Sequence, residues 1–382
     1  MKIYLDNAAT TKVDEKVVKA MQPYFTEKFG NPSSLHFAGE EARRDLENAR
    51  ETIAKSVGAK YKEIIFTGSG TEANNFALKG LFWKNFPNKN HIITTKIEHD
   101  CILQTCKWLE TQGAKITYLD VCDKGFVNPQ DLLEAITDKT FLVSIIHGNN
   151  EVGTIQHIEK LTKICNEKNI LFHTDACQSF TKVSINVKKI GIDLMTINAH
   201  KIHGPKAIGA LYIREAIKIT PLLHGGGQEF KLRSSTENTA GIIGFAKAVK
   251  IASNSDVKQM KKLRDYFIQE LLKIPNTKLN GATGEERLCN NINLSFKNIE
   301  GEAIGSFLNA KQIFISTGSA CSSKSLEPSH VLTALGMSPL EANSSIRLSI
   351  SKYTTKKEID FALKEIKNTV EKLRRMSPLV GR

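Results

Sequence analysis

A lysine and an aspartate in this sequence have the types and positions that carbonyl chemistry requires. Lys201 follows the apolar run 192–197, which predicts a strand, and a glycine and a proline just after it keep the lysine in a loop. Asp175 follows a second apolar run, 170–172. Because neighbouring parallel strands end at one crevice, we expect the two side chains to converge there. A lysine that binds an aldehyde, beside an acid that pairs with a ring nitrogen, is the arrangement that pyridoxal phosphate needs.

Lys201 taken by itself has less specific interpretations. A lysine at a strand end can stay solvated, pair with an acid or bind phosphate, and most lysines only stay solvated. The acid at a second strand end is what favours the cofactor interpretation.

A glycine turn between a predicted strand and a predicted helix forms a candidate phosphate site. The strand is residues 63–67, the turn is Gly68-Ser69-Gly70 and the helix is 71–80. Free backbone N–H groups and the positive end of the helix dipole meet at such a turn, which suits a phosphate. The run matches neither the P-loop nor the dinucleotide-binding motif, and Thr71 could instead serve only as the helix N-cap.

Five polar residues are candidate ligand contacts, four in loops or at element ends and one within a predicted strand. His99, at a strand-to-helix junction, could stack on a ring or move a proton, or bond only to its own helix start. Asn150 and Gln178, at strand exits, suit either a ligand oxygen or a turn. Asn31 favours a turn over contact with a substrate carboxylate. Arg347 interrupts a predicted strand, and its guanidinium is costly to bury unless it meets an anion such as a carboxylate.

Cys321 differs from the other six cysteines. Its neighbours from Ser316 to Ser322 are nearly all small or hydroxylic, which predicts an exposed and mobile loop, and a positive field there would favour the thiolate. Cys321 is therefore a candidate reactive thiol, although a lone cysteine can also be inert. Cys165 and Cys289 are predicted to be small buried hydrophobes. The scattered spacing, without a C-x-x-C pair, argues against a disulfide framework or a zinc site.

The composition predicts a globular enzyme in the cytoplasm. The chain has 382 residues and 41% hydrophobic content, enough for two or three domains with a core. It shows neither a signal-peptide pattern at its start nor an apolar run long enough for a membrane span. The net charge of +13 comes from basic residues interleaved with acids, which argues against a nucleic-acid partner and leaves acidic small molecules or an acidic protein possible.

Strand–helix alternation over residues 63–213 predicts an α/β protein with a mostly parallel, doubly wound sheet. A glycine-rich, polar arm over 224–238 has too few apolar residues to build core, so we expect it to cross a surface or reach a neighbouring subunit. The polar run 253–256 suggests a domain boundary, followed by a smaller α+β domain. The predicted division is 1–14, an N-terminal segment that packs with the small domain; 15–255, the large domain; and 256–382, the small domain with the Cys321 loop.

Nine motifs, in order from about residue 3 to residue 380, resemble those of the cysteine desulfurases. The similar group includes the nitrogen-fixation and housekeeping iron–sulfur cluster enzymes. The motifs are Asp6-Asn-Ala-Ala-Thr-Thr11, Thr71-Glu-Ala-Asn-Asn75, Glu98-His99, Asn149-Asn-Glu-Val-Gly153, Asp175-Ala-Cys-Gln178, His200-Lys-Ile-His-Gly-Pro205, Arg233-Ser-Ser-Thr236, Gly318-Ser-Ala-Cys-Ser-Ser323 and Ser345-Ile-Arg347. The resemblance implies a homodimer of the aspartate-aminotransferase fold type I, a pyridoxal-phosphate-dependent transferase fold.

The resemblance also implies a role for each candidate residue. Lys201 would carry the cofactor as a Schiff base, Asp175 would pair with the ring nitrogen, and His99 would stack on the ring and transfer protons. Gln178 and Asn150 would lie near the ring oxygen. The implied phosphate contacts are Gly70, Thr71, Asn198, His200 and, from the partner subunit, Thr236. The implied contacts of the substrate carboxylate are Asn31 and Arg347.

The implied activity is removal of sulfur from L-cysteine, which leaves L-alanine and a persulfide on Cys321 for transfer to an iron–sulfur scaffold protein or another acceptor. Cys321 would also be a transient iron–sulfur cluster ligand shared with that scaffold. Two positions depart from the family pattern: Asn198 stands where serine is usual, and Ala207 where glycine is common. Alternatives are an aminotransferase or a selenocysteine lyase of the same fold, or an inactive scaffold that binds RNA or an acidic partner.

Overall fold

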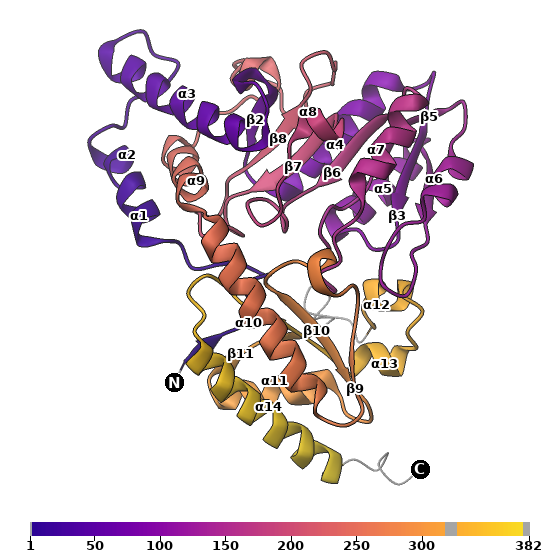
Figure 1. Cartoon of the computed structure of the whole chain (residues 1–382). Coiled ribbons are helices and arrows are strands. Elements are labelled where there is room, and N and C mark those ends of the chain that lie inside the picture. The colour runs from indigo at the N-terminus through magenta and orange to yellow at the C-terminus, as the bar shows by residue number, and fades with distance from the viewer. Residues whose placement is uncertain (1, 318–326, 377–382) are drawn as a thin grey trace.

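The computed structural model describes residues 2–317 and 327–376, and it shows a wide α/β part above a smaller α+β part (Figure 1). The large part contains a seven-stranded sheet. Its strands are β2 (Ile64–Thr67), β3 (His91–Thr95), β4 (Lys115–Leu119), β5 (Thr140–Ser144), β6 (Leu171–Asp175), β7 (Leu194–Asn198) and β8 (Gly209–Ile213). The helices between them are α4 (Gly70–Asn85), α5 (Asp100–Thr111), α6 (Pro129–Ala135), α7 (Ile158–Glu167) and α8 (Val187–Ile190).

The sheet is mostly parallel, as the strand–helix alternation predicts. Its strand order is β2-β8-β7-β6-β5-β3-β4. β8 runs antiparallel to both of its neighbours, β2 and β7, whereas the remaining pairs are parallel. β6 and β7 are adjacent and parallel, so their carboxyl ends lie at one edge of the sheet.

Both faces of this sheet are covered, which is why its strands are almost continuously apolar. One core joins β5, β6 and β7 to α6, α7 and α8 and to helices outside the strand–helix repeat, and a second core joins the other face to α4 and α5. The helices outside the repeat are α1 (Glu15–Met21), α2 (Pro23–Thr26), α3 (Phe37–Val57) and α9 (Thr239–Ile251). Single 3-10 turns lie at Tyr61–Glu63, Glu229–Lys231 and Gly284–Glu286.

The small part has its own core, built on a four-stranded sheet of order β12-β13-β10-β9. Its strands are β9 (Thr277–Leu279), β10 (Asn291–Phe296), β12 (Ser316–Thr317) and β13 (Ser345–Ser349). Its helices are α10 (Asn254–Leu272), α11 (Gly301–Ala310), α12 (His330–Ala334), α13 (Pro339–Asn343) and α14 (Lys356–Met376). β1 (Ile3–Tyr4) pairs in parallel with β11 (Ile313–Phe314), so the chain start lies beside this part.

The polar run 253–256 is the start of a helix and not an extended linker. Ser253 caps α10, and its Oγ accepts from the backbone N–H of Asp256. Ser, Asn and Asp favour helix starts for the same reason that they favour loops, which is that their side chains bond to nearby backbone groups. α9 ends at Ile251, so only two residues separate the two helices. The division at 255/256 stays a prediction and lies within the first turn of α10.

The arm that follows β8 is anchored in the core of its own chain, which the sequence did not predict. Glu229 is buried, and its carboxylate pairs with the buried guanidinium of Arg50 on α3 at 2.6 Å. The same carboxylate accepts from the backbone N–H of Phe66 at 2.7 Å. Removing either charge would leave the other buried and unpaired, at a cost of about 3–5 kcal/mol.

None of the helices in the described ranges combines the length and apolar character that a membrane span requires.

Candidate active site

A cavity of about 410 Å³ lies at the carboxyl ends of β6 and β7, beside the start of α4. Most of the residues that line it are polar or small. They are Asp6, Ala8, Ala9, Ser69, Gly70, Thr71, Asn74, His99, Cys101, Ile146, Asn150, Asp175, Cys177, Gln178, Asn198, His200, Lys201 and Arg347. The two residues predicted to converge from neighbouring strand ends, Asp175 and Lys201, are thus on one cavity.

Asp175 is the last residue of β6, and only 5% of it is exposed. One carboxylate oxygen, Oδ1, accepts from the backbone N–H of Cys177 at 2.9 Å. The other, Oδ2, accepts from the side-chain amide of Asn74 at 2.7 Å. Two donors therefore fix the carboxylate in one orientation, and as a buried negative group it favours a cationic partner in the cavity.

Lys201 lies in the loop after β7 and directs its amine toward the N-terminal segment. Its Nζ donates to the backbone carbonyls of Ala8 and Ala9. Burial lowers the pKa of Lys201 to about 8, helped by the positive charges of Arg347 and Lys182, whereas Cys177 and Asp6 act in the opposite direction. A large fraction of the amine is therefore neutral near pH 8, and the neutral amine is the nucleophilic form.

The start of α4 supplies backbone N–H groups to the cavity. The helix begins at Gly70, and the N-cap is Ser69, whose Oγ accepts from the N–H of Glu72 at 3.0 Å. Thr71 is therefore not the N-cap, and that simpler interpretation is wrong. A Cβ on Gly70 would lie 2.7 Å from the sulfur of Cys177, so glycine keeps the helix start close to the end of β6.

Three asparagines in the cavity have a side-chain oxygen, Oδ1, that is buried without a hydrogen-bond partner among the described residues. They are Asn74 on α4, Asn150, which follows β5, and Asn198, which ends β7. Because a buried polar group without a partner is costly, these atoms are suited to receive a hydrogen bond from a bound group. Gln178 differs, because its Nε2 already donates to the carbonyl of Ala8 at 2.8 Å.

Two histidines line the cavity: His200 is neutral, and His99 is hydrogen-bonded to the start of its own helix. Burial lowers the pKa of His200 to about 4, so this ring is uncharged at neutral pH. His99 is the N-cap of α5, and its Nδ1 accepts from the backbone N–H of Cys101 at 3.1 Å. That role assigns the proton of a neutral His99 ring to Nε2. His99 therefore both caps its helix and lines the cavity, so the two interpretations of this residue do not exclude each other.

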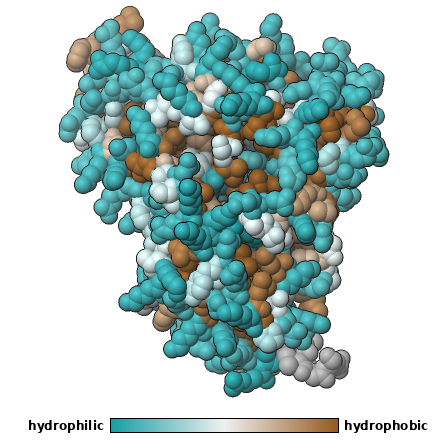
Figure 2. Space-filling model, viewed as in Figure 1, coloured by the Kyte–Doolittle hydropathy of each residue, from teal (hydrophilic) through white to brown (hydrophobic). Residues whose placement is uncertain are grey.

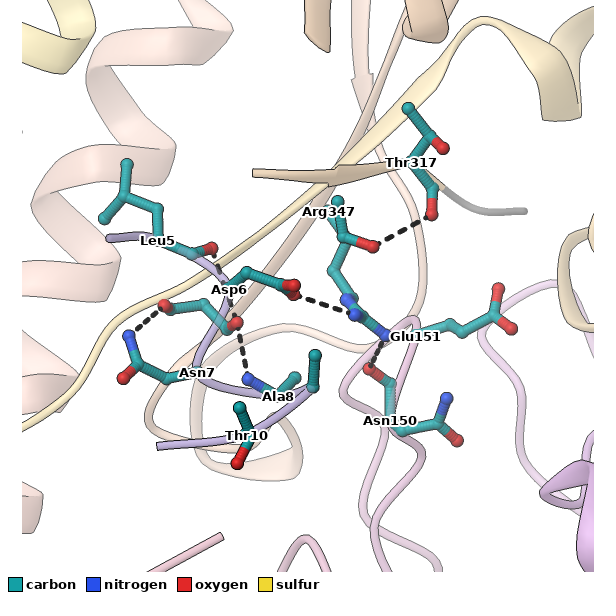
Figure 3. A network of polar contacts seen from close by, with 12 residues as sticks. Leu5, Asp6, Asn7, Ala8, Thr10, Asn150, Glu151, Thr317 and Arg347 are labelled. Carbon is teal, nitrogen blue, oxygen red and sulfur yellow. Dashed lines mark hydrogen bonds and ion pairs between the residues drawn. The ribbon is translucent and has the colours of Figure 1, made fainter. Parts of the chain in front are cut away.

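Arg347 in β13 is paired within the chain (Figure 3). Its Nη2 donates to Oδ1 of Asp6 at 3.0 Å, and its Nη1 donates to the carbonyl of Asn150 at 3.2 Å. Its Nε is buried without a partner among the described residues, and the residue as a whole is 4% exposed. Ser349 of the same strand accepts from the N–H of Ala8 at 2.7 Å, which holds the N-terminal segment against the cavity.

Two predicted site residues, Asn31 and Thr236, are not on this cavity. Asn31 is exposed, and its Oδ1 accepts from the N–H of Ser33 at 2.9 Å, which is the turn role. Thr236 is exposed as well. Cys321 lies outside the described residues.

Four polar or thiol side chains of the cavity were not among the candidates of the sequence analysis: those of Asp6, Asn74, Cys101 and Cys177. Asn74 lies one helical turn after Gly70, a spacing that puts both on one face of α4. Cys177 is two residues beyond Asp175, and Cys101 is two beyond His99. For Asp6, the sequence indicated only that its small, polar segment could approach a ligand.

Cys165 and Cys289 are buried, which confirms the prediction for those two.

The departures from the family pattern have unequal structural consequences. Ala207 has a φ of 57°, in the left-handed region that favours glycine, so an L-residue there costs roughly 1–2 kcal/mol. Asn198 is buried, and its side-chain nitrogen lies on the Gly70 side of the cavity, 3.4 Å from where a Cβ of that glycine would be. An amide donor is thus retained where the family usually has a hydroxyl.

A family model described as aminotransferase class-V matches residues 3–361. The chain therefore belongs to the class-V aminotransferase family. The cysteine desulfurase IscS of Dictyoglomus turgidum is 50% identical over 381 residues, covering 98% of this chain and 96% of that protein. The cysteine desulfurase IscS of Methanosarcina thermophila is 49% identical over 380 residues, covering 99% of this chain and 94% of that protein. Within the family, the chain groups with the cysteine desulfurases, as its motifs predict.

Solved structures agree with this grouping and confirm the predicted fold. A NifS-like protein has a TM-score of 0.92 and 40% identity, covering 98% of this chain and 100% of that chain. A structure titled SspA in complex with cysteine has a TM-score of 0.84 and 40% identity, covering 93% of this chain and 100% of that chain.

Proposed function

We propose that this chain binds pyridoxal phosphate in the 410 Å³ cavity and uses it to remove sulfur from L-cysteine. The observation that carries the proposal is the convergence of Lys201, whose burial lowers its pKa to about 8, and the fixed carboxylate of Asp175 on one cavity. Similarity to cysteine desulfurases then selects this chemistry from the wider family.

The residues present fit the cofactor. Lys201 would bind its aldehyde and Asp175 its ring nitrogen, with His99 against the ring. Asn150 and Gln178 would lie near the ring oxygen, to which each can offer a side-chain amide N–H. The phosphate would be held by N–H groups at the α4 start, by Gly70, Thr71, Asn198 and His200, and by Thr236 of the partner subunit. When bound, the cofactor supplies an electron sink that weakens bonds at the Cα and Cβ of an attached amino acid.

Arg347 would hold the substrate carboxylate. Its guanidinium offers a fork of parallel donors, one arm of which now contacts Asp6, so a substrate carboxylate must compete with that carboxylate or join it. The neutral amine of Lys201, once displaced from the aldehyde, can take the Cα proton and return it. His99, whose Nδ1 accepts from the backbone N–H of Cys101, can donate from Nε2 to groups in the cavity.

Cys321 would accept the sulfur. Its thiolate attacks the sulfur of the substrate, a sulfur–sulfur bond forms as the Cβ–S bond breaks, and the electron pair of that bond leaves on carbon. With protonation at Cβ, the products are L-alanine and a persulfide on Cys321. Sulfur is conserved, because one cysteine and one thiol give one alanine and one persulfide.

We expect Arg347→Gln to raise KM for L-cysteine by roughly 10- to 100-fold, because a charged fork on a carboxylate contributes about 1.5–3 kcal/mol. The cofactor spectrum should change little, since Arg347 is not among the proposed cofactor contacts. Steady-state kinetics at saturating cofactor measures the effect. Lys352→Gln, which removes a cation that pairs with Asp14 away from the cavity, is the control. An unchanged KM for Arg347→Gln would contradict the carboxylate role.

The proposed assembly is a homodimer formed through an apolar patch around Asn31. Phe25, Phe29, Leu35 and Phe37 are 65, 76, 86 and 76% exposed, and Figure 2 shows hydrophobic side chains at the tip of the molecule where α3 begins. Large apolar side chains that gather on a surface mark protein contacts. An interface there would also bring Asn31 near a second chain, where it could contact a substrate.

The double substitution Leu35→Asp and Phe37→Asp should convert the dimer to a monomer, raising the dissociation constant about 100-fold or more because two apolar anchors become charged. Sedimentation velocity over a concentration series measures this change. Leu340→Asp, which changes a leucine that is 59% exposed on α13, should leave the dimer intact. Dimers that persist in the double variant would place the interface elsewhere.

The reaction is tested by supplying the purified chain with pyridoxal phosphate and L-cysteine and measuring alanine, sulfide and protein-bound sulfur. Desulfuration predicts alanine equal to the sulfur released, without any need for a 2-oxo acid. An aminotransferase would require the oxo acid and leave the sulfur on its product. A selenocysteine lyase would turn over selenocysteine and leave cysteine unchanged.

We propose the cytoplasm as the location and an iron–sulfur scaffold protein as an acceptor, with Cys321 as a shared cluster ligand.

A further inference from the structure

Lys182 lies next to the loop of Lys201, and none of the acidic side chains in the described residues pairs with it. Its Nζ donates to the backbone carbonyl of Gln178 at 2.9 Å and to the backbone carbonyl of Lys201 at 3.2 Å. The ionisable groups that act on it from other elements are Cys289 and Cys177, neither of which is a carboxylate. Burial lowers the pKa of Lys182 to about 8. The two carbonyls are thus what stabilises this amine.

Lys182 is separated from the active-site cavity by the chain of Lys201. Both lysines line a small cavity of about 40 Å³ between the large and small parts, whereas of the two only Lys201 lines the cavity with Asp175. Lys182 therefore does not touch a cofactor or substrate in that cavity. It can act there only through the residues whose carbonyls it binds.

The backbone just before Lys182 is in a costly conformation. Thr181 has a φ of 63°, which is in the left-handed region that a β-branched residue rarely adopts. Strain of this kind persists only where the surrounding structure holds the residue in place, and it gathers at functional sites. This conformation brings the chain from the Asp175 turn to the position from which Lys182 reaches both carbonyls.

We propose that Lys182 is a positioning residue, which fixes the turn after Asp175 and the loop of Lys201 at one separation by donating to a carbonyl of each. Gln178 is in the turn that follows Asp175, and Lys201 is bonded through its own carbonyl. The proposal rests on the proposed function, because the separation matters only if one cofactor is bound at both residues. A misplacement of about 1 Å at a reacting group costs up to about 100-fold in rate.

A role in packing alone predicts a different outcome for the same substitution. Methionine matches lysine in length and apolar stem, and replacing a desolvated charge by an apolar residue of similar volume is often neutral or stabilising. If Lys182 only filled space, Lys182→Met would fold at least as stably and work as well as the wild type. If Lys182 positions the two loops, the methionine chain folds but loses both hydrogen bonds.

The test compares Lys182→Met and Lys182→Arg with the wild type and with Lys188→Met, which makes the same change at an exposed lysine of α8. We expect Lys182→Met to lower kcat for L-cysteine by roughly 10- to 100-fold while KM changes less than about twofold. The dissociation constant of pyridoxal phosphate from the unloaded chain should rise about tenfold. Lys182→Arg should recover kcat to within about threefold, because guanidinium still donates to carbonyls and the 40 Å³ cavity leaves room for it.

The proposal is overturned if Lys182→Met matches the wild type in kcat and in cofactor binding. It is also overturned if the methionine and arginine variants lose kcat equally and both unfold at a lower temperature, since that is a structural defect. If Lys182→Met does not fold, Lys182→Gln serves instead. Glutamine is too short to reach both carbonyls, so reduced kcat supports the proposal and wild-type kcat overturns it. A wild-type chain that neither binds the cofactor nor desulfurates cysteine would instead refute the proposed function.

Discussion

Lys201→Ala will reduce cysteine desulfuration by about 10³-fold or more and will abolish the visible absorbance that bound pyridoxal phosphate gives to the wild type. The substitution removes both the group that would bind the aldehyde and the base that would take the Cα proton, and a positioned base alone contributes about 10²–10⁴-fold. Visible absorbance and alanine formation are the two measurements. Lys206→Ala changes an exposed lysine in the same loop and should keep both.

The pH dependence of cofactor binding gives a second measurement on Lys201. Because burial lowers its pKa to about 8, the neutral amine is scarce at pH 6 and abundant above pH 8. We expect the rate at which the unloaded chain binds pyridoxal phosphate to rise about tenfold per pH unit below 8 and to flatten above it. A Lys201→Ala chain that keeps the absorbance, or a wild-type rate that rises without a break up to pH 10, would contradict the assignment.

Cys321→Ser will abolish persulfide formation while leaving the cofactor bound. A serine hydroxyl at neutral pH is a far weaker nucleophile toward sulfur than a thiolate, so we expect sulfur transfer to fall by about 10³-fold or more. Mass spectrometry of the protein after exposure to L-cysteine should show one added sulfur atom on the peptide with Cys321 in the wild type and none in the variant. Cys122→Ser, at an exposed cysteine, is the matched control.

Two thiols already in the cavity are competing acceptors, and their environment argues against them. Burial raises the pKa of Cys101 to about 12 and raises that of Cys177 well above its usual value. Both therefore keep their protons at neutral pH, and a protonated thiol does not attack sulfur. Added sulfur found on Cys101 or Cys177 would refute the role of Cys321.

Local sequence predicted most elements because their signals are local. The apolar runs before Asp175 and Lys201 are strands, and the glycine turn before Thr71 opens a helix. The same local signals misled where one residue type has two uses. Ser253 begins a helix although its neighbours resemble a linker, and Glu229 is buried although its segment resembles a surface arm, because Arg50 neutralises it there.

The sequence by itself determined the fold class and the family, together with the residues most suited to the chemistry, since strand periodicity and ordered motifs are written in neighbouring positions. Only the tertiary structure decided which groups share a cavity and what each already binds. Asn74 holds the carboxylate of Asp175, Asp6 pairs with Arg347, and Lys182 supports the loop of Lys201. Each of these contacts joins segments that are distant in the sequence and meet only in the packed structure. That packing decides which partner each side chain has, how far away the partner lies and how deeply both are buried.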